Sequence, residues 1–175
     1  MTAPVPAGHG AHAAPVLSAA GPQDSATCWA IYVRAVRDGA GAHYSTAERR
    51  AWIGATAEPP WMAERLAVGR TWLAKRAGVP VGFLTGTGLG DVGPAHLDLF
   101  FVLPEARGTG VASALYAAFD AAAAGQAMTG YASLFLRPML ERRGWQTVRP
   151  DPQERDGQTL MRFVMARAAR PRAGS

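Results

Sequence analysis

The sequence predicts one mixed α/β (α+β) domain built on a mixed sheet. The chain has 175 residues, which fits one domain with a modest core. Hydrophobic residues make up 49% and charged residues 18%, as is ordinary for a globular protein. Apolar residues recur first with a helical period and then, from about residue 70, with the period of strands. We therefore expect the domain over 15–167, between flexible tails rich in small residues at 1–14 and 168–175.

The first part of the chain is expected to hold a short strand and three helices. The strand covers 15–19. A helix follows over 25–38, because apolar residues there recur at i, i+3, i+4 and i+7. Ser45, with Glu48 three residues on, forms a capping box and predicts a second helix directly after it. A proline in the first turn predicts a third, short helix over 60–68.

Most of the strands are expected after residue 70. They cover 70–76, 80–85, 96–102, 129–134, 145–148 and 159–165. A long Ala-rich helix at 110–124 and a short one at 137–143 fall between them, and a polar loop joins the last two strands. The connection at 86–93 contains G-x-G-x-x-G, but Pro94 and a strand follow it. A dinucleotide-binding turn requires a helix there, so we interpret the connection as a loop.

The segment from His96 to Leu115 joins a strand, a glycine turn and a helix without interruption. The strand stops at Pro104, and Gly108 and Gly110 lie in the turn. Such a turn directs free backbone N–H groups to one point at the positive end of a helix dipole, and glycine lets a phosphate approach closely. The pattern predicts a site for a phosphorylated ligand, with a tight structural turn as the alternative.

The residues Arg107-Gly-Thr-Gly110-Val-Ala112 resemble the Arg/Gln-x-x-Gly-x-Gly/Ala signature of the GNAT superfamily of N-acetyltransferases. Residues 133–145 are similar to the later helix of that family, which ends in a Gly-Phe or Gly-Trp pair, and the order of elements matches over 15–167. The pattern Tyr44-Ser-x-x-x-Arg-x-x-Trp52 resembles, more weakly, a bacterial subgroup. The resemblance implies a GNAT-like fold and transfer of acetyl from acetyl-CoA to an amine of a small molecule or a protein in a ternary complex.

The resemblance also implies a CoA-binding surface. Backbone N–H groups of the 107–112 loop would hold the pyrophosphate. The strand near Phe101 and Val102 would pair with the pantetheine arm, and an N–H there would polarise the thioester carbonyl. Ser133 falls where many family members carry an Asn that contacts CoA. The implied cofactor-binding residues are Phe101, Val102, Arg107, Gly108, Thr109, Gly110, Val111, Ala112 and Ser133.

An N-acetyltransferase gains from a base near its acceptor, because an alkyl amine is almost fully protonated at neutral pH. Asp98 is the first candidate. It falls where family members often place a basic carboxylate, and on an alternating strand it shares a face with His96 and Phe100. A satisfied structural carboxylate is the alternative. His96 is the second candidate base.

The family's usual acid, a tyrosine four residues before the glycine that matches Gly144, is Leu140 here. Leucine cannot donate a proton, so a water, Tyr131 or Tyr116 would have to protonate the leaving thiolate. The same substitution supports a second function, a non-catalytic or weakly active acyl-CoA-binding regulatory module.

The charge pattern does not predict a nucleic-acid partner. The net charge is +5, but the arginines are scattered without interleaved aromatics, so a basic nucleic-acid-binding domain is only a third alternative. No apolar stretch reaches the roughly 18 residues of a membrane helix. The one cysteine, Cys28, suggests neither a disulfide nor a metal site. Without a secretion signal we expect a cytoplasmic protein. A homodimer would suit the family, but the sequence shows none.

Overall fold

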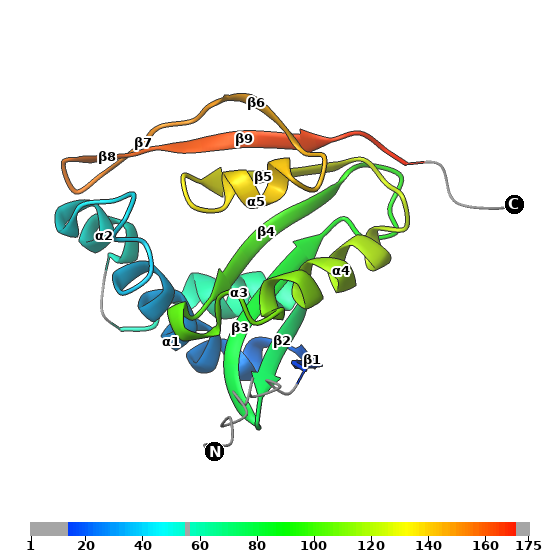
Figure 1. Cartoon of the computed structure of the whole chain (residues 1–175), viewed down its shortest axis with the longest axis horizontal. Helices are drawn as coiled ribbons and strands as arrows, with labels where there is room; N and C mark the ends of the chain where they lie inside the picture. Colours follow the sequence, from blue (N-terminus) through cyan, green and yellow to red (C-terminus); the bar gives the residue numbers. More distant parts are fainter. Residues whose placement is uncertain (1–13, 55–56, 171–175) are drawn as a thin grey trace, which may run out of the picture.

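A seven-stranded sheet forms the centre of the structure, a computed structural model that describes residues 14–54 and 57–170 (Figure 1). The strand order is β1-β2-β3-β4-β5-β9-β6. Neighbours are antiparallel except β4 and β5, which are parallel. The strands are β1 (Val16–Ala20), β2 (Arg70–Arg76), β3 (Val79–Thr87), β4 (Ala95–Val102), β5 (Met128–Ser133), β6 (Gln146–Pro150) and β9 (Arg162–Arg167). The expected mixed α/β class is thus confirmed. The tails expected at 1–14 and 168–175 lie largely outside the described residues.

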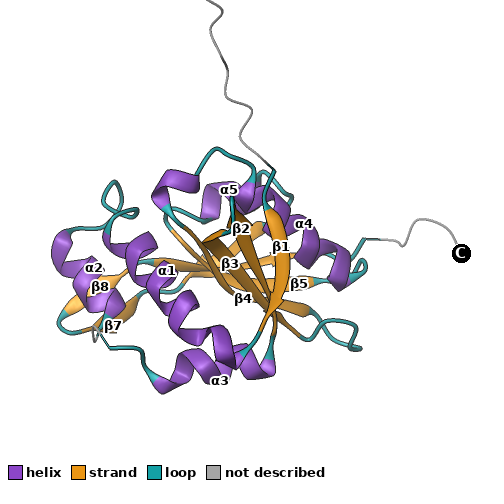
Figure 2. Cartoon of the chain, turned by 90° about the horizontal axis from the view of Figure 1, so that it is seen from below, coloured by secondary structure: helices purple, strands orange, loops and turns teal. Residues whose placement is uncertain are grey.

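Helices cover both faces of the sheet (Figure 2). They are α1 (Ser25–Arg37), α2 (Thr46–Ile53), α3 (Pro60–Val68), α4 (Val111–Ala123) and α5 (Arg137–Glu141). Side chains of α4 pack over the glycines of β3, because added Cβ atoms at Gly82 and Gly86 would meet Val111 and Phe119. Helices α1 and α3 pack on the opposite face. No helix in the described part of the chain combines the length and the apolar character needed to cross a bilayer.

Local sequence signals fix the ends and faces of the early helices. Ser45 Oγ accepts the N–H of Glu48 at 3.2 Å, and the Glu48 carboxylate accepts the N–H of Ser45 at 2.7 Å, so the capping box is confirmed. The expected apolar stripe of α1 is buried at Trp29, Tyr32 and Val36. The buried stripe packs α1 into the core, the cap sets where α2 begins, and residues of both helices line the cavities described below.

A β-bulge at Asp98 breaks the alternation of β4. Thr85 of β3 pairs with Leu99 and Gly86 pairs with Leu97, which leaves Asp98 without a cross-strand partner. Directly opposed residues share a face of the sheet, and Phe100 is opposed to Leu84.

The bulge makes one expectation wrong. Phe100 lies on the α4 face, because its partner Leu84 shares a face with Gly82 and Gly86, two residues away on either side, which face α4. Asp98 instead reaches Arg65 of α3 on the other face, the face that His96 shares through its partner Thr87. Extra residues of this kind redirect side chains next to functional sites.

The polar loop expected before the last strand is a second difference. The structure has a hairpin there, β7 (Gln153–Arg155) and β8 (Gln158–Leu160), and β9 begins only at Arg162. Asp156 and Gly157 join the two short strands with φ of 46° and 70°. Positive φ at both positions is the geometry that an Asp-Gly pair adopts in a two-residue hairpin turn. This dipeptide was the signal for the hairpin.

The glycine-rich connection between β3 and β4 is a loop, as expected. It wraps around the side-chain amide of Gln126. Nε2 of that amide donates to the carbonyls of Gly88 at 3.0 Å and Gly93 at 2.8 Å, and Oε1 accepts the N–H of Gly90 at 2.8 Å. These three backbone groups of the loop are therefore satisfied by one side chain.

Candidate active site

The site lies where β4 and β5 separate. Their parallel ladder has three residue pairs, Ala95 with Met128, His96 with Thr129 and Leu97 with Gly130. Beyond Leu97 the two strands diverge, so the backbone of residues 98–102 faces β5 across a gap (Figure 1). A strand edge without a ladder partner can pair with an extended ligand.

Two cavities open from this gap. One, the loop-side cavity, has a volume of about 510 Å³ and reaches the turn before α4. The other, the hairpin-side cavity, has a volume of about 880 Å³ and reaches the β7–β8 hairpin. Five residues line both: Trp52, Asp98, Phe101, Tyr131 and Ser133. The cavities therefore meet at the ends of β4 and β5.

The glycine turn has the geometry expected of an anion site. Gly108 and Gly110 have φ of 73° and 87°, in the region that favours glycine. A Cβ added to either would meet no atom within 4 Å. The first backbone hydrogen bond of α4 runs from Ala114 N–H to the carbonyl of Gly110. The N–H groups of residues 111–113 have no acceptor in the described chain, and α4 directs them toward the turn.

The side chain of Arg107 holds this turn in place. Nη1 donates to the carbonyl of Gly39, just after α1, at 2.6 Å. The guanidinium also stacks on the ring of Phe135, 4.1 Å from the centroid. A Cβ at Gly39 would clash with Nη2 of Arg107 and would lie 2.6 Å from the carbonyl oxygen of Ala35, so glycine fits best where the arginine docks. The motif arginine thus positions the loop, and the backbone around it stays available for a ligand.

Other expected cofactor-binding residues face the site to different degrees. Val111 is fully buried in the core, and the Thr109 hydroxyl donates to the carbonyl of Ala106 at 2.6 Å. Ser133 Oγ accepts the N–H of Leu136 at 3.1 Å, which leaves its O–H able to donate. The loop-side cavity is lined by Phe101, Val102, Arg107, Gly108, Ala112 and Ser133.

Asp98 projects from the bulge between the two cavities. One carboxylate oxygen accepts from Arg65 at 2.6 Å, and the side chain is only 17% exposed. Arg65 also stacks on Trp61, 5.4 Å from the ring centroid. The other carboxylate oxygen makes no hydrogen bond to a described residue. The carboxylate is therefore held in place with one oxygen available.

The other two candidate catalytic residues lie next to Asp98. Tyr131 lines both cavities, whereas His96 lies behind it, with the rings edge to face at 5.8 Å. His96 Nδ1 is 2.9 Å from Thr129 Oγ1. Burial lowers the pKa of His96, which keeps it neutral near pH 7. The structure thus brings Asp98 and Tyr131 to the junction and leaves His96 behind them.

Only Tyr131 among the four tyrosines has a hydroxyl that is free of partners in the described chain. The Tyr116 hydroxyl accepts from Trp145 at 2.8 Å and Arg167 at 2.9 Å, outside both cavities. Tyr32 donates to the carbonyl of Trp52, and burial raises its pKa to about 12. Leu140 is fully buried in the core.

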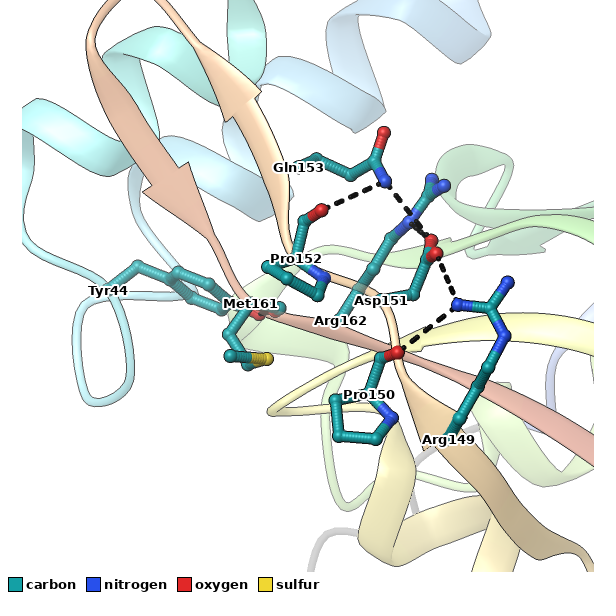
Figure 3. Close-up of polar contacts among 8 residues, drawn as sticks. All are labelled: Tyr44, Arg149, Pro150, Asp151, Pro152, Gln153, Met161 and Arg162. Carbon is teal, nitrogen blue, oxygen red and sulfur yellow. Dashed lines mark hydrogen bonds and ion pairs between the residues drawn. The ribbon is translucent and has the colours of Figure 1, made fainter.

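Tyr44 ties the loop before α2 to the segments that flank the gap on its far side, one of which contains Met161 (Figure 3). Its hydroxyl donates to the carbonyl of Met161 at 2.6 Å and accepts the N–H of Leu134 at 2.9 Å. Its ring packs edge to face on Trp52 at 5.1 Å. The loop before α2 is thereby tied to the far side of the gap, and Trp52 is held between the two cavities.

The carboxylate of Asp151 joins the end of β6 to the start of β9. Asp151 accepts from Arg149 at 3.0 Å and from Arg162 at 2.6 Å (Figure 3). These bonds, that from Arg162 first, lower the pKa of Asp151. Arg162 in turn stacks on Tyr131, 4.1 Å from the ring centroid. The Asp151 contacts therefore help to hold Arg162 over the ring of Tyr131.

Sequence reasoning missed several residues that line the loop-side cavity, above all Phe135, Met139, Arg142 and Arg143. The available signal was a pair of arginines directly before Gly144. Within the described residues, no three His, Cys, Asp or Glu side chains gather as metal ligands.

Comparison with known proteins identifies the family. The model of the acetyltransferase (GNAT) domain matches residues 40–167. The uncharacterized N-acetyltransferase YafP of Escherichia coli (strain K12) is 34% identical over 144 residues, which are 82% of this chain and 89% of that protein.

Solved structures agree on the fold. A GCN5-related N-acetyltransferase from Rhodopseudomonas palustris has a TM-score of 0.78 at 27% identity and covers 92% of this chain and 99% of its own. PaiA N-acetyltransferase from Thermoplasma acidophilum, solved in complex with coenzyme A, has a TM-score of 0.67 at 12% identity, with 89% and 99% covered. The family model alone covers well over half of the chain, which therefore belongs to the GNAT family of acetyltransferases, as the resemblance of the glycine turn implied.

Proposed function

We propose that the protein transfers acetyl from acetyl-CoA to an amine by direct attack of the amine in a ternary complex. The observation that carries this proposal is the junction of two cavities at Asp98, Tyr131 and the free edge of β4. A cofactor entering from the loop side and an acceptor entering from the hairpin side would meet there. The coenzyme A in the fold relative from Thermoplasma acidophilum supports the choice of cofactor.

The loop-side cavity is the proposed CoA site. The N–H groups of residues 111–113 and the glycine turn would bind the pyrophosphate, because they present unpaired donors at a helix N-terminus. The pantetheine arm would pair with the edge of β4 at Phe101 and Val102. A free N–H on that edge would stabilise the charge that develops on the thioester oxygen. The Ser133 hydroxyl would donate to the arm from the side of β5.

Asp98 is the proposed base on the acceptor side. Its free carboxylate oxygen lies between the cavities, while Arg65 fixes the other oxygen at 2.6 Å. It would take the proton from the bound ammonium, either directly or through a water, before the amine attacks the thioester. His96, behind Tyr131 and neutral, is a supporting residue in this scheme.

Tyr131 is the proposed acid. It lines both cavities, and its hydroxyl is free to donate toward the sulfur as the C–S bond breaks. Arg162 covers one face of its ring and holds the side chain in place. With Tyr131 as the acid, the reaction does not need a tyrosine at the position of the buried Leu140.

A module that binds acyl-CoA with little turnover is the second candidate. One observation favours it, because Leu140 is fully buried and offers no proton donor. The two candidates differ in turnover and share the cofactor, so binding and rate must be measured separately.

The first test is thermal unfolding with and without acetyl-CoA. At a hundred times its dissociation constant, a ligand of the folded state adds about 2.7 kcal/mol, a shift of several degrees in a domain of this size. We expect a shift with acetyl-CoA and CoA and none with NAD. Thiol release across a panel of amines then separates the candidates, since the module predicts a shift without release. No shift at millimolar acetyl-CoA would remove the CoA site altogether.

The substitution Gly110→Asp tests the pyrophosphate site. A carboxylate at the turn would repel the pyrophosphate, and we expect acetyl-CoA affinity to fall by about 100-fold, the loss of a charge-assisted hydrogen bond or more. Gly110→Asn is the matched control, because it carries the same positive-φ strain without the charge. Both variants should lose similar thermal stability. Calorimetric titration that finds equal affinities for the two would argue against a phosphate at this turn.

The substitution Asp98→Asn tests the base. We expect kcat/KM to fall by about 100-fold near pH 7, within the usual range for general-base catalysis. The deficit should shrink as the pH rises toward the pKa of the amine, because the free amine then forms without help. Asp91→Asn, at an exposed aspartate outside both cavities, is the control and should keep the wild-type pH profile. A constant deficit across the pH profile would assign Asp98 a structural role.

The substitution Tyr131→Phe tests the acid while it keeps the ring under Arg162. We expect kcat to fall by about tenfold or more, with little change in the KM for acetyl-CoA, because proton donation acts in the transition state. Tyr44→Phe is not a suitable control, since it breaks the Met161 contact. Tyr116→Phe is the better control because Tyr116 lies outside both cavities: it loses its contacts with Trp145 and Arg167, so we expect lower thermal stability but a wild-type rate for the folded protein. An unchanged rate in Tyr131→Phe would leave protonation to water.

A further inference from the structure

Charge is distributed unevenly in the loop-side cavity. Three arginines line it: Arg107, Arg142 and Arg143. Asp98 is the one carboxylate among its lining residues, and it lies at the inner end, where the cavity joins its neighbour. The end beside the glycine turn is therefore positively charged. Arg107 is committed to the carbonyl of Gly39, which leaves the two adjacent arginines at the end of α5.

Arg143 is held beside the start of α4. Its Nη2 donates to Ser113 Oγ at 3.0 Å and its Nη1 to the carbonyl of Met139 at 3.2 Å. The guanidinium also lies over the ring of Tyr116, 5.0 Å from the centroid. Ser113 is the third residue of α4, so this fixed positive charge lies next to the unpaired N–H groups of that helix.

Arg142 lines the same cavity and is exposed. Its guanidinium has no hydrogen-bond or ion-pair partner in the described chain. The carboxylate next to it in sequence, Glu141, is occupied by Arg137 at 2.7 Å. Arg142 is thus an uncompensated cation beside a cation that the fold holds in place.

We propose that Arg142 and Arg143 form a subsite for the phosphates of CoA, in which Arg142 binds the 3′-phosphate of the ribose. This inference rests on the proposed CoA site. CoA carries two phosphate groups at one end, the diphosphate and the 3′-phosphate. The diphosphate belongs at the N–H groups of α4, where Arg143 is fixed. The 3′-phosphate needs a second cation nearby that can adapt its position, and the unpaired Arg142 is that cation. Guanidinium groups bind phosphate through paired, charge-assisted hydrogen bonds.

The test compares CoA with 3′-dephospho-CoA by calorimetric titration of the whole chain. We expect the wild type to bind CoA about tenfold or more tightly than 3′-dephospho-CoA, as one charge-assisted contact would give. In Arg142→Ala that preference should vanish through weaker binding of CoA alone, and Arg142→Lys should restore part of it. Arg143→Ala should weaken both ligands by the same factor, since both contain the diphosphate.

Arg50→Ala is the matched control, an exposed arginine of α2 outside both cavities, and should behave as the wild type. A wild type that does not discriminate between the two ligands, or an Arg142→Ala variant that keeps the wild-type ratio, would overturn the subsite. Failure of the proposed function has a different result, because the wild type would then bind neither ligand.

Discussion

The site depends on one irregularity, the extra residue that Asp98 adds to β4. On its β3 side the strand keeps its ladder through the bulge, while on its β5 side the ladder ends at Leu97. The bulge changes the twist of β4 at the point where the two parallel strands part. It also sends Asp98 and Phe100 to opposite faces. The cleft, the free strand edge and the position of the carboxylate therefore share one local cause.

Features that could be predicted from the sequence are those set by neighbours along the chain. The capping box at Ser45 involves residues three apart, and the buried stripe of α1 repeats every turn. The glycine turn was recognisable because Gly108 and Gly110 adopt positive φ within a few residues of the helix that they precede. Such signals need no knowledge of the rest of the fold.

Features that could not be predicted depend on contacts between distant segments. The assumption that residues 96–102 alternate strictly between two faces misses the bulge at Asp98, which only the register against β3 reveals. The docking of Arg107 on Gly39 joins residues 68 apart, so no local signal could show that this side chain holds the glycine turn in place. No local signal relates Arg142 and Arg143 to the glycine turn, because their position depends on the contact of Arg143 with Ser113 of α4. The β7–β8 hairpin is different, because its signal, the Asp156-Gly157 pair, is local and could have predicted the turn.

For the proposed reaction, a leucine at the position of the family's tyrosine should cost less in rate than the loss of the base. A thiol with a pKa near 8.5 leaves as a thiolate at modest cost near neutral pH, whereas an alkyl ammonium with a pKa near 10.4 must lose its proton at a cost of about 4–5 kcal/mol. A fully buried leucine contributes about 2 kcal/mol to the core, and Leu140 is fully buried. In the proposed mechanism the loss of the acid therefore costs less than the loss of the base would, and the buried Leu140 side chain adds packing that stabilises α5.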